Sequence, residues 1–387
     1  MRIAAIRERS IAISRYADPA IPSGGLTTSV VAVVTDIVRA GRPVVGYGYA
    51  SVGRFAQGGL IRERFAPRLL NAIGGALADD ADENLDPFRA WAVMMAGEKP
   101  GGHGERCVAI GALDMAIWDA AAKIAKKPLY RHLAERLGRD VADGPRSRVY
   151  AGGGYLYPND DIAQLSDEMR TFRDLGFTQA KIKIGSTSLD QDLRRIEAAA
   201  TQLTGSEHLA VDAMNCFDAD SSLVTASALA PFGLRWFEDI CDPLDFTTQS
   251  RVAAAYERPI AAGEALFSLA EAKLLNQHGG LRSDRDILVF DPVHCYGLPG
   301  YLRIIEHFTS EGWPRQAFWP HGGHLFSLHL VAALDLGGAE VNPLAFRPFN
   351  GLFDAAEIAA GHAELPQIPG IGFELHSEAW REFQALL

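Results

Sequence analysis

Hydrophobic and polar positions alternate in two different ways along the chain, and the change comes near residue 147. Before it, runs rich in Ile and Val predict three short strands, and amphipathic runs after them predict three helices. The predicted strands cover residues 2–13, 27–38 and 42–49, and the predicted helices cover about residues 60–75, 86–95 and 105–125. A small meander of strands followed by helices is typical of an α+β domain.

After residue 147, short apolar runs alternate with amphipathic stretches such as Asp161–Leu175. Strands that alternate with helices are typical of a parallel sheet built from βα units. The predicted strands are Arg148–Gly152, Gln179–Ile184, Leu209–Ala213, Leu234–Phe237, Pro259–Gly263, Ile287–Phe290, Gln316–Trp319 and Leu336–Glu340. Eight such strands predict an α/β fold, a (β/α)8 TIM-type barrel. An open doubly wound sheet is the alternative, but no GxGxxG sequence follows the first strand.

These patterns divide the chain into three regions. We predict an N-terminal α+β capping domain at residues 1–125 and a barrel domain at residues 126–345. Residues 346–387 are rich in Gly and Pro, and we expect this C-terminal segment to return to the cap and complete it. A chain of 387 residues is long enough to bury a large core without disulfides.

Composition excludes several classes of partner. The formal net charge of −11 argues against nucleic acid or an anionic membrane surface as a partner. The four cysteines are widely scattered, so their spacing predicts neither a zinc site nor a disulfide framework. The N terminus lacks an apolar signal core, and no apolar run is long enough to span a membrane. We therefore expect a cytoplasmic protein with reduced thiols.

Two lysines stand two residues apart in the apolar run Ala180–Gly185. Side chains at positions i and i+2 of a strand point to the same face, so the amines of Lys181 and Lys183 are expected to lie together. Two neighbouring positive charges lower each other's pKa, and a lysine with a lowered pKa can act as a base near neutral pH. An edge strand with two solvated lysines is the alternative interpretation.

Carboxylates stand at the ends of three successive predicted barrel strands. Asp212, Glu238 and Glu264 are equally spaced along the chain, about one βα repeat apart. Taken singly, each could cap the following helix or lie in a solvated turn. Taken together, they are expected to converge at the carboxyl-terminal face of the barrel, where barrel enzymes have their active sites. Three carboxylates repel one another, so the pattern predicts a divalent cation with oxygen ligands, and Mg²⁺ suits such a site.

The later strands add further polar groups at the same face. Asp291 and His321 end two neighbouring predicted strands, and an Asp–His hydrogen bond between them would hold and orient the imidazole. Glu340 ends the eighth predicted strand. We interpret His324 as structural, because no HExxH zinc motif is present.

This order of residues resembles the enolase superfamily, in particular its mandelate racemase subgroup. The shared pattern runs from the Lys-x-Lys pair through the acids to the histidine at a barrel face, with an α+β cap. Loop sequences in and near the cap are similar to those of the D-tartrate dehydratase family within this subgroup. The similar stretches are residues 27–34, 44–48, 58–65, 98–106, 242–245, 320–324 and 365–373.

The resemblance implies a role for each matching residue. It implies Mg²⁺ held by Asp212, Glu238 and Glu264. Lys183 would be the general base, and the acid on the opposite face would be His321. Supporting catalytic roles are implied for Lys181, which would also contact the substrate, and for Asp291. Substrate contacts are implied for Glu340, for Lys99 and Arg54 of the cap, and for Tyr157.

The resemblance also implies the reaction. We expect a Mg²⁺-dependent hydro-lyase that dehydrates a small acid sugar or dicarboxylate, with D-tartrate to oxaloacetate as the first candidate, in a homo-oligomer. A racemase or epimerase using the same lysine and histidine is an alternative, and a non-catalytic ligand-binding barrel is another. Met214, His294 and Val52 depart from the family pattern, and these departures bear on the substrate more than on the reaction type.

Overall fold

Three antiparallel strands form the sheet of the N-terminal cap in the computed structural model, which describes residues 1–387. The strands are β1 (Ile3–Ala12), β2 (Thr27–Arg39) and β3 (Arg42–Tyr49), in the order β1-β2-β3. Residues 28–33 of β2, which are mostly Val and Ala, are all buried. The middle of this strand is therefore buried on both faces. The predicted meander of three strands is therefore present.

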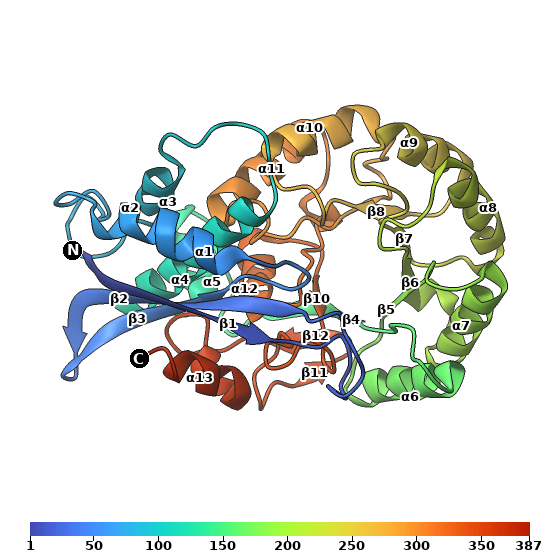
Figure 1. Ribbon diagram of the computed structural model, residues 1–387, viewed down its shortest axis with the longest axis horizontal. Helices are drawn as coiled ribbons and strands as arrows, with labels where there is room; N and C mark the ends of the chain where they lie inside the picture. Colours follow the sequence, from blue (N-terminus) through green and yellow to red (C-terminus); the bar gives the residue numbers. More distant parts are fainter.

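Helices follow this sheet along the chain and lie beside it in the same half of the molecule (Figure 1). They are α1 (Gln57–Leu60), the π-helical turn η1 (Ile61–Phe65), α2 (Ala66–Leu70), α3 (Pro87–Met95), α4 (Glu105–Ile124) and α5 (Leu129–Arg136). Helix α4 packs directly on β3, where a Cβ atom on Gly46 would lie 1.9 Å from the carbonyl oxygen of Ala116. Glycine at this position lets the helix and the strand approach each other closely. The sequence pattern missed α5.

Parallel strands form the barrel, and helices lie around its outside (Figure 1). The strands are β4 (Arg146–Gly152), β5 (Ala180–Lys183), β6 (Leu209–Asp212), β7 (Phe237–Glu238), β8 (Ile260–Ala262), β9 (Ile287–Leu288) and β10 (Ala339–Val341). The helices are α6 (Asp161–Asp174), α7 (Leu189–Gln202), α8 (Ala219–Leu229), α9 (Phe246–Ala255), α10 (Leu269–His278), α11 (Leu298–Ser310) and α12 (Leu325–Leu334), with short 3-10 turns η2 (Ser206–His208), η3 (Ala230–Phe232) and η4 (Arg315–Ala317).

The barrel closes through its seventh segment, which differs from the prediction. Residues 316–319 were expected to form a strand, but they begin as the turn η4 and make a single bridge, between Phe318 and Leu288. The segment still joins its neighbours, because the Trp319 amide donates to Leu288 and the Gly337 amide donates to Phe318. Strand β10 then pairs with β4 and completes the ring. The predicted barrel with an α+β cap is confirmed.

The C-terminal segment contacts both parts of the molecule. Its hairpin consists of β11 (Ile358–Ala359) and β12 (His362–Glu364). Strand β12 pairs antiparallel with the first residues of β4. After the turn η5 (Phe373–Leu375), helix α13 (Ser377–Gln384) packs on the cap sheet, where the ring of Trp380 lies 5.2 Å from that of Tyr47. The segment thus contacts both the barrel and the cap sheet, while the division of the chain into three regions stays a prediction. No helix is long and apolar enough to cross a membrane.

Candidate active site

The carboxyl ends of the barrel strands bring the predicted polar residues to one place. Lys183, Glu264, His321 and Glu340 line a cavity of about 210 Å³ at this face. The parallel register sets their height, because Lys183 of β5 is paired with Asp212 of β6, and Asp212 is paired with Glu238 of β7. Neighbouring side chains at the same level of a barrel point to the same side, so the groups converge.

The three predicted metal ligands lie together. One carboxylate oxygen from each of Asp212, Glu238 and Glu264 lies within 4.8 Å of the others. Asp212 and Glu238 are fully buried, and the Oε2 atom of Glu264 is buried without a hydrogen-bond partner. Burial and the charges of Asp212 and Glu264 raise the pKa of Glu238 to about 7, against the lowering effect of Lys181. Three crowded carboxylates, one with an oxygen that makes no hydrogen bond, fit a hard divalent cation such as Mg²⁺.

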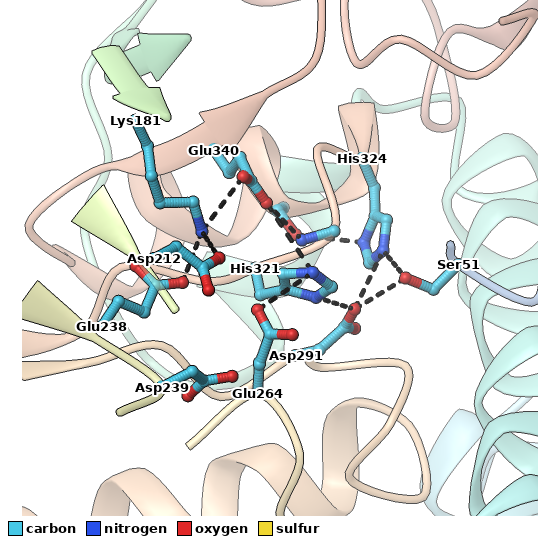
Figure 2. A network of polar contacts seen from close by, with 12 residues as sticks. Ser51, Lys181, Asp212, Glu238, Asp239, Glu264, Asp291, His321, His324 and Glu340 are labelled. Carbon is cyan, nitrogen blue, oxygen red and sulfur yellow. Dashed lines mark hydrogen bonds and ion pairs between the residues drawn. The ribbon is translucent and has the colours of Figure 1, made fainter. Parts of the chain in front are cut away.

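Both lysines point toward these carboxylates (Figure 2 shows Lys181). Lys183 donates to Asp212, and Lys181 donates to Glu238 and lies 3.3 Å from Glu340. Burial lowers the pKa of each ammonium group, but the carboxylates outweigh it: Asp212 raises the pKa of Lys183, and Glu238 and Glu340 raise that of Lys181. Lys181 does lower the pKa of Lys183, as expected, but the expected net lowering was wrong, because the neighbouring carboxylates outweigh the second amine.

His321 and Asp291 form the predicted pair. The Nδ1 atom of His321 lies 3.1 Å from Oδ2 of Asp291, and its Nε2 atom lies 3.3 Å from Oε2 of Glu264 (Figure 2). Burial lowers the pKa of His321, but Glu264 and the hydrogen bond to Asp291 raise it to about 9. Burial also raises the pKa of Asp291, and the surrounding histidines hold it well below its usual value. The imidazole therefore carries a proton that its Nε2 atom can donate.

The lysine and the histidine flank the carboxylate trio. Lys183 contacts Asp212 at one end of the trio, whereas His321 lies beside Glu264 at the other end. Glu340 completes the ring between them, because its carboxylate accepts the amide of Gly322 at 3.1 Å and lies 3.9 Å from His321. An amine and an imidazole thus contact different members of the trio at one cavity.

Of the three substrate contacts predicted outside the barrel strands, Arg54 lines the cavity, whereas Lys99 and Tyr157 do not. Arg54 lines the cavity, and its guanidinium group lies 4.6 Å from the ring of Phe267 with no hydrogen bond or ion pair. Lys99 does not line it but faces a separate cavity of about 320 Å³ with His103, because Glu98 ties that loop to Arg64. The prediction for Lys99 was wrong in this respect.

Tyr157 is also displaced from the cavity. Its hydroxyl donates to the buried carboxylate of Glu168, at 3.2 Å, and its ring packs against Tyr16. Tyr155 takes the position expected for Tyr157 and lies over the amine of Lys183, 5.5 Å from the ring centre. The sequence held a signal for this, since Tyr155 is nearer than Tyr157 to the end of β4.

Sequence reasoning missed several residues of the site. The cavity is also lined by Arg15 of the first loop and by Asn342, and by His294, which the sequence marked only as a departure from the family pattern. A fourth acid, Asp239, lies next to Glu238 and accepts a hydrogen bond from Asn215 at 3.2 Å (Figure 2). Burial and the charge of Glu264 raise the pKa of Asp239 well above its usual value. Loop residues such as Arg15 follow no period, so no sequence pattern marked them.

Comparisons with known proteins agree with this arrangement. The chain is 27% identical over 309 residues to an arabinonate dehydratase of Saccharolobus solfataricus, covering 78% of this chain and 79% of that protein. It is 35% identical over 263 residues to a 3,6-anhydro-alpha-L-galactonate cycloisomerase of Streptomyces coelicolor, covering 67% of each. Its fold matches the crystal structure of L-talarate dehydratase from Polaromonas sp. JS666 complexed with Mg and L-glucarate, with a TM-score of 0.70, 26% identity and coverage of 95% and 94%.

The barrel carries the family relationship. Residues 164–380 match the sequence profile described as Enolase C-terminal domain-like, and this range includes the lysine pair, the carboxylate trio, Asp291, His321 and Glu340. More than half of the chain is matched. The chain therefore belongs to the Enolase C-terminal domain-like family.

Proposed function

We propose that this protein is a Mg²⁺-dependent hydro-lyase that dehydrates a small acid sugar, with D-tartrate, which would give oxaloacetate and water, as the first candidate substrate. The observation that carries the proposal is the placement of Lys183 and His321 on different sides of the Asp212–Glu238–Glu264 trio. The names of relatives support it, since they include an arabinonate dehydratase and an L-talarate/galactarate dehydratase.

The trio would hold the metal. When bound, a Mg²⁺ ion neutralises these carboxylates, including the Asp212 charge that raises the pKa of Lys183, and stabilises negative charge developing on the substrate carboxylate. Lys181 stays paired with Glu238 and Glu340 and keeps a positive charge beside the same carboxylate. The dicarboxylate or acid-sugar ligand is thus met by positive charge although the whole chain is acidic.

Lys183 and His321 divide the proton transfers between them. The amine of Lys183 takes the proton from the carbon α to the substrate carboxylate. The Nε2 atom of His321 gives its proton to the β-hydroxyl, the carbon–oxygen bond breaks, and water leaves. The remaining enol takes up a proton and becomes a 2-keto acid. Asp291 holds Nδ1 of His321, so that Nε2 faces the cavity as the acid.

Two free guanidinium groups belong to the wall of the cavity. Arg54 and Arg15 line it, and neither side chain makes a hydrogen bond or an ion pair. Guanidinium groups bind carboxylates in a paired, planar geometry, so these residues support a substrate with a second carboxylate. In this proposal they replace Lys99 and Tyr157, which the structure places outside the cavity.

A substrate screen tests the proposal. Purified protein with Mg²⁺ is incubated with a panel of diacids and sugar acids, D-tartrate among them, and the 2-keto acid formed is measured. We expect one acid or a small related group to react, and no reaction after Glu264→Gln. If no member of the panel gives a keto acid while the protein binds Mg²⁺, the dehydratase proposal is wrong.

An epimerase is the second candidate, and the same flanking pair favours it. Lys183 and His321 could exchange the α-proton from different sides without loss of hydroxide. The screen distinguishes the two reactions when it is run in heavy water. Deuterium at the α-carbon together with inversion and no keto acid indicates epimerisation, whereas keto acid with one water released per turnover indicates dehydration.

A further inference from the structure

A cap residue contacts the acid side of the site from outside the barrel. Ser51 follows β3, and its hydroxyl lies 2.7 Å from Oδ2 of Asp291, the oxygen that also holds His321 (Figure 2). Ser51 is 1% exposed. Its backbone has φ 59°, a left-handed conformation that is unfavourable for a residue with a side chain. A strained, buried hydroxyl that points into the site is held there by its surroundings.

The hydrogen bonds around Ser51 have one consistent direction. The ionised carboxylate of Asp291 can only accept, so the Ser51 hydroxyl donates to it. The oxygen of Ser51 is then free to accept from Nε2 of His324, which lies 2.7 Å away, and Nδ1 of His324 lies 3.2 Å from the hydroxyl of Ser327. All of these groups are buried. The chain of bonds ends at Asp291. It fixes the position of the oxygen that accepts the hydrogen bond from Nδ1–H of His321.

The same cap loop reaches the substrate cavity. Val52, Gly53 and Arg54 follow Ser51 directly, and all three line the cavity. The backbone carbonyl of Ser51 is held in turn by the hydroxyl of Thr28 on β2, at 2.9 Å. A ligand that binds Arg54 therefore pulls on a loop whose first residue, Ser51, is hydrogen-bonded to Asp291. Seating of the cap and alignment of the acid are linked through one side chain.

We propose that Ser51, supported by His324, is a positioning residue that holds Asp291 so that His321 is aligned as the acid only when the cap loop is seated on the barrel. The inference rests on the proposed function and deepens it. Ser51 acts on the His321 half of the reaction and leaves the Lys183 half untouched, because no bond of the chain from Ser327 to Asp291 reaches Lys183. Loss of a hydrogen bond to a charged group lowers the affected step by about 10- to 100-fold.

Two variants separate this role from folding. Ser51→Ala removes the hydroxyl and keeps the backbone strain, whereas Ser51→Gly removes the hydroxyl and relieves the strain, since glycine adopts positive φ freely. Ser327→Ala is the matched control, because it removes a hydroxyl from the same chain without touching Asp291. For each protein, keto acid formation and deuterium uptake at the α-carbon of recovered substrate are measured in heavy water with Mg²⁺.

The expected result is a split between the two readouts. Keto acid formation falls about 10- to 100-fold in both Ser51 variants, α-proton exchange stays within about twofold of the unmodified protein, and Ser51→Gly unfolds at the same temperature or above. Ser327→Ala, which removes only the bond of the chain farthest from Asp291, loses less keto acid formation than either Ser51 variant. Equal loss of exchange and elimination in Ser51→Gly, or no loss in either Ser51 variant, overturns the proposal.

A readout without turnover keeps the two proposals apart. In histidine-labelled protein, the proton resonance of His321 Nδ1–H reports its bond to Asp291. We expect Ser51→Ala and Ser51→Gly to shift this resonance, and amide exchange of residues 51–54 to become faster. If the unmodified protein neither exchanges nor dehydrates any acid, the proposed function fails, and these signals still decide the role of Ser51: an unchanged resonance overturns it.

Discussion

At the scale of single residues, Lys183 and His321 should fail in different ways. Lys183→Met removes the amine that contacts Asp212, so we expect both α-proton exchange and keto acid formation to fall by about 10²- to 10⁴-fold. His321→Asn keeps a donor near Asp291 but removes the proton on Nε2, so elimination should fall to the same extent while exchange persists. Isotope uptake and keto acid assays on the same samples provide the comparison. If α-proton exchange vanishes in His321→Asn, then His321 takes part in removing the proton, and the assignment of Lys183 as the only base is wrong.

A second residue-scale prediction concerns acid stability and lies far from the site. His329 is buried, its Nδ1 accepts the amide of Tyr130 at 3.2 Å, and its Nε2 donates to the carbonyl of Ile371 at 2.9 Å. Burial lowers the pKa of His329 to about 4, from an ordinary value of 6.5. The folded state thus prefers the neutral ring, and protonation would remove the acceptor at Nδ1.

The sign of the pH dependence follows from this lowered pKa. Between about pH 6.5 and pH 4, His329 is protonated in the unfolded chain and neutral in the folded chain. As the pH is lowered through this range, the contribution of His329 lowers the free energy of unfolding by up to about 3 kcal/mol. Above pH 6.5 the residue has no such effect. In His329→Gln the pH dependence of urea unfolding should be weaker by that amount. His132, whose pKa burial also lowers to about 4, leaves a remaining slope, and an unchanged slope in the variant contradicts the assignment.

At the scale of elements, the contact between β3 and α4 sets how the cap is built. A Cβ atom on Gly48 would lie 2.4 Å from the carbonyl oxygen of Ala112, and one on Gly46 would lie closer still to Ala116. Backbone atoms cannot move aside as side chains do, so Gly48→Ala should lower the free energy of unfolding by about 1–3 kcal/mol. Gly59→Ala, in α1 with nothing within 4 Å, is the control and should be neutral or slightly stabilising. Urea midpoints that fall equally in both variants argue against tight packing as the cause.

Elements also show what the sequence could and could not predict. Period-two and helical patterns located the cap strands and most barrel elements. The phase of the strand ends brought the carboxylate trio and the Asp291–His321 pair to one face of the barrel, where Glu264 and His321 line the cavity. The segment 316–319 was predicted as a strand because its composition is apolar, but pairing depends on neighbours that composition does not reveal. The pKa of Lys183 was misjudged for the same reason, since the deciding charge, Asp212, comes from another strand.

Loop side chains were the least predictable part of the site. Lys99 and Tyr157 were expected in the cavity, yet their directions are set by Glu98 and Glu168, which are distant from the motifs that marked the site. Ser51 carried no signal at all, because its importance arises only where the cap loop meets Asp291. Regular periods predict which face a residue takes, whereas contacts between loops and other elements require the folded chain.

At the scale of the whole molecule, the carboxylate trio makes stability depend on the metal. Without an ion, Asp212, Glu238 and Glu264 crowd their charges within 4.8 Å, and the two lysines offset only part of that repulsion. An ion that binds the folded chain and not the unfolded one stabilises it by mass action, by about 2.7 kcal/mol at a concentration of 100 times Kd. Mg²⁺ should therefore raise the unfolding temperature by a few degrees in a concentration-dependent way, and a chelator should reverse the shift.

Matched variants separate the trio from any other ion site. Glu238→Gln keeps the shape of the side chain and removes one charge, so the unfolding temperature without Mg²⁺ should change little, while the rise with Mg²⁺ should shrink strongly. Asp80→Asn changes an exposed surface acid and should leave the rise intact. Scanning calorimetry across a Mg²⁺ series measures both effects. A rise of equal size in Glu238→Gln would mean that the ion binds elsewhere, because a site that has lost one of three charged ligands cannot keep its preference for the folded state.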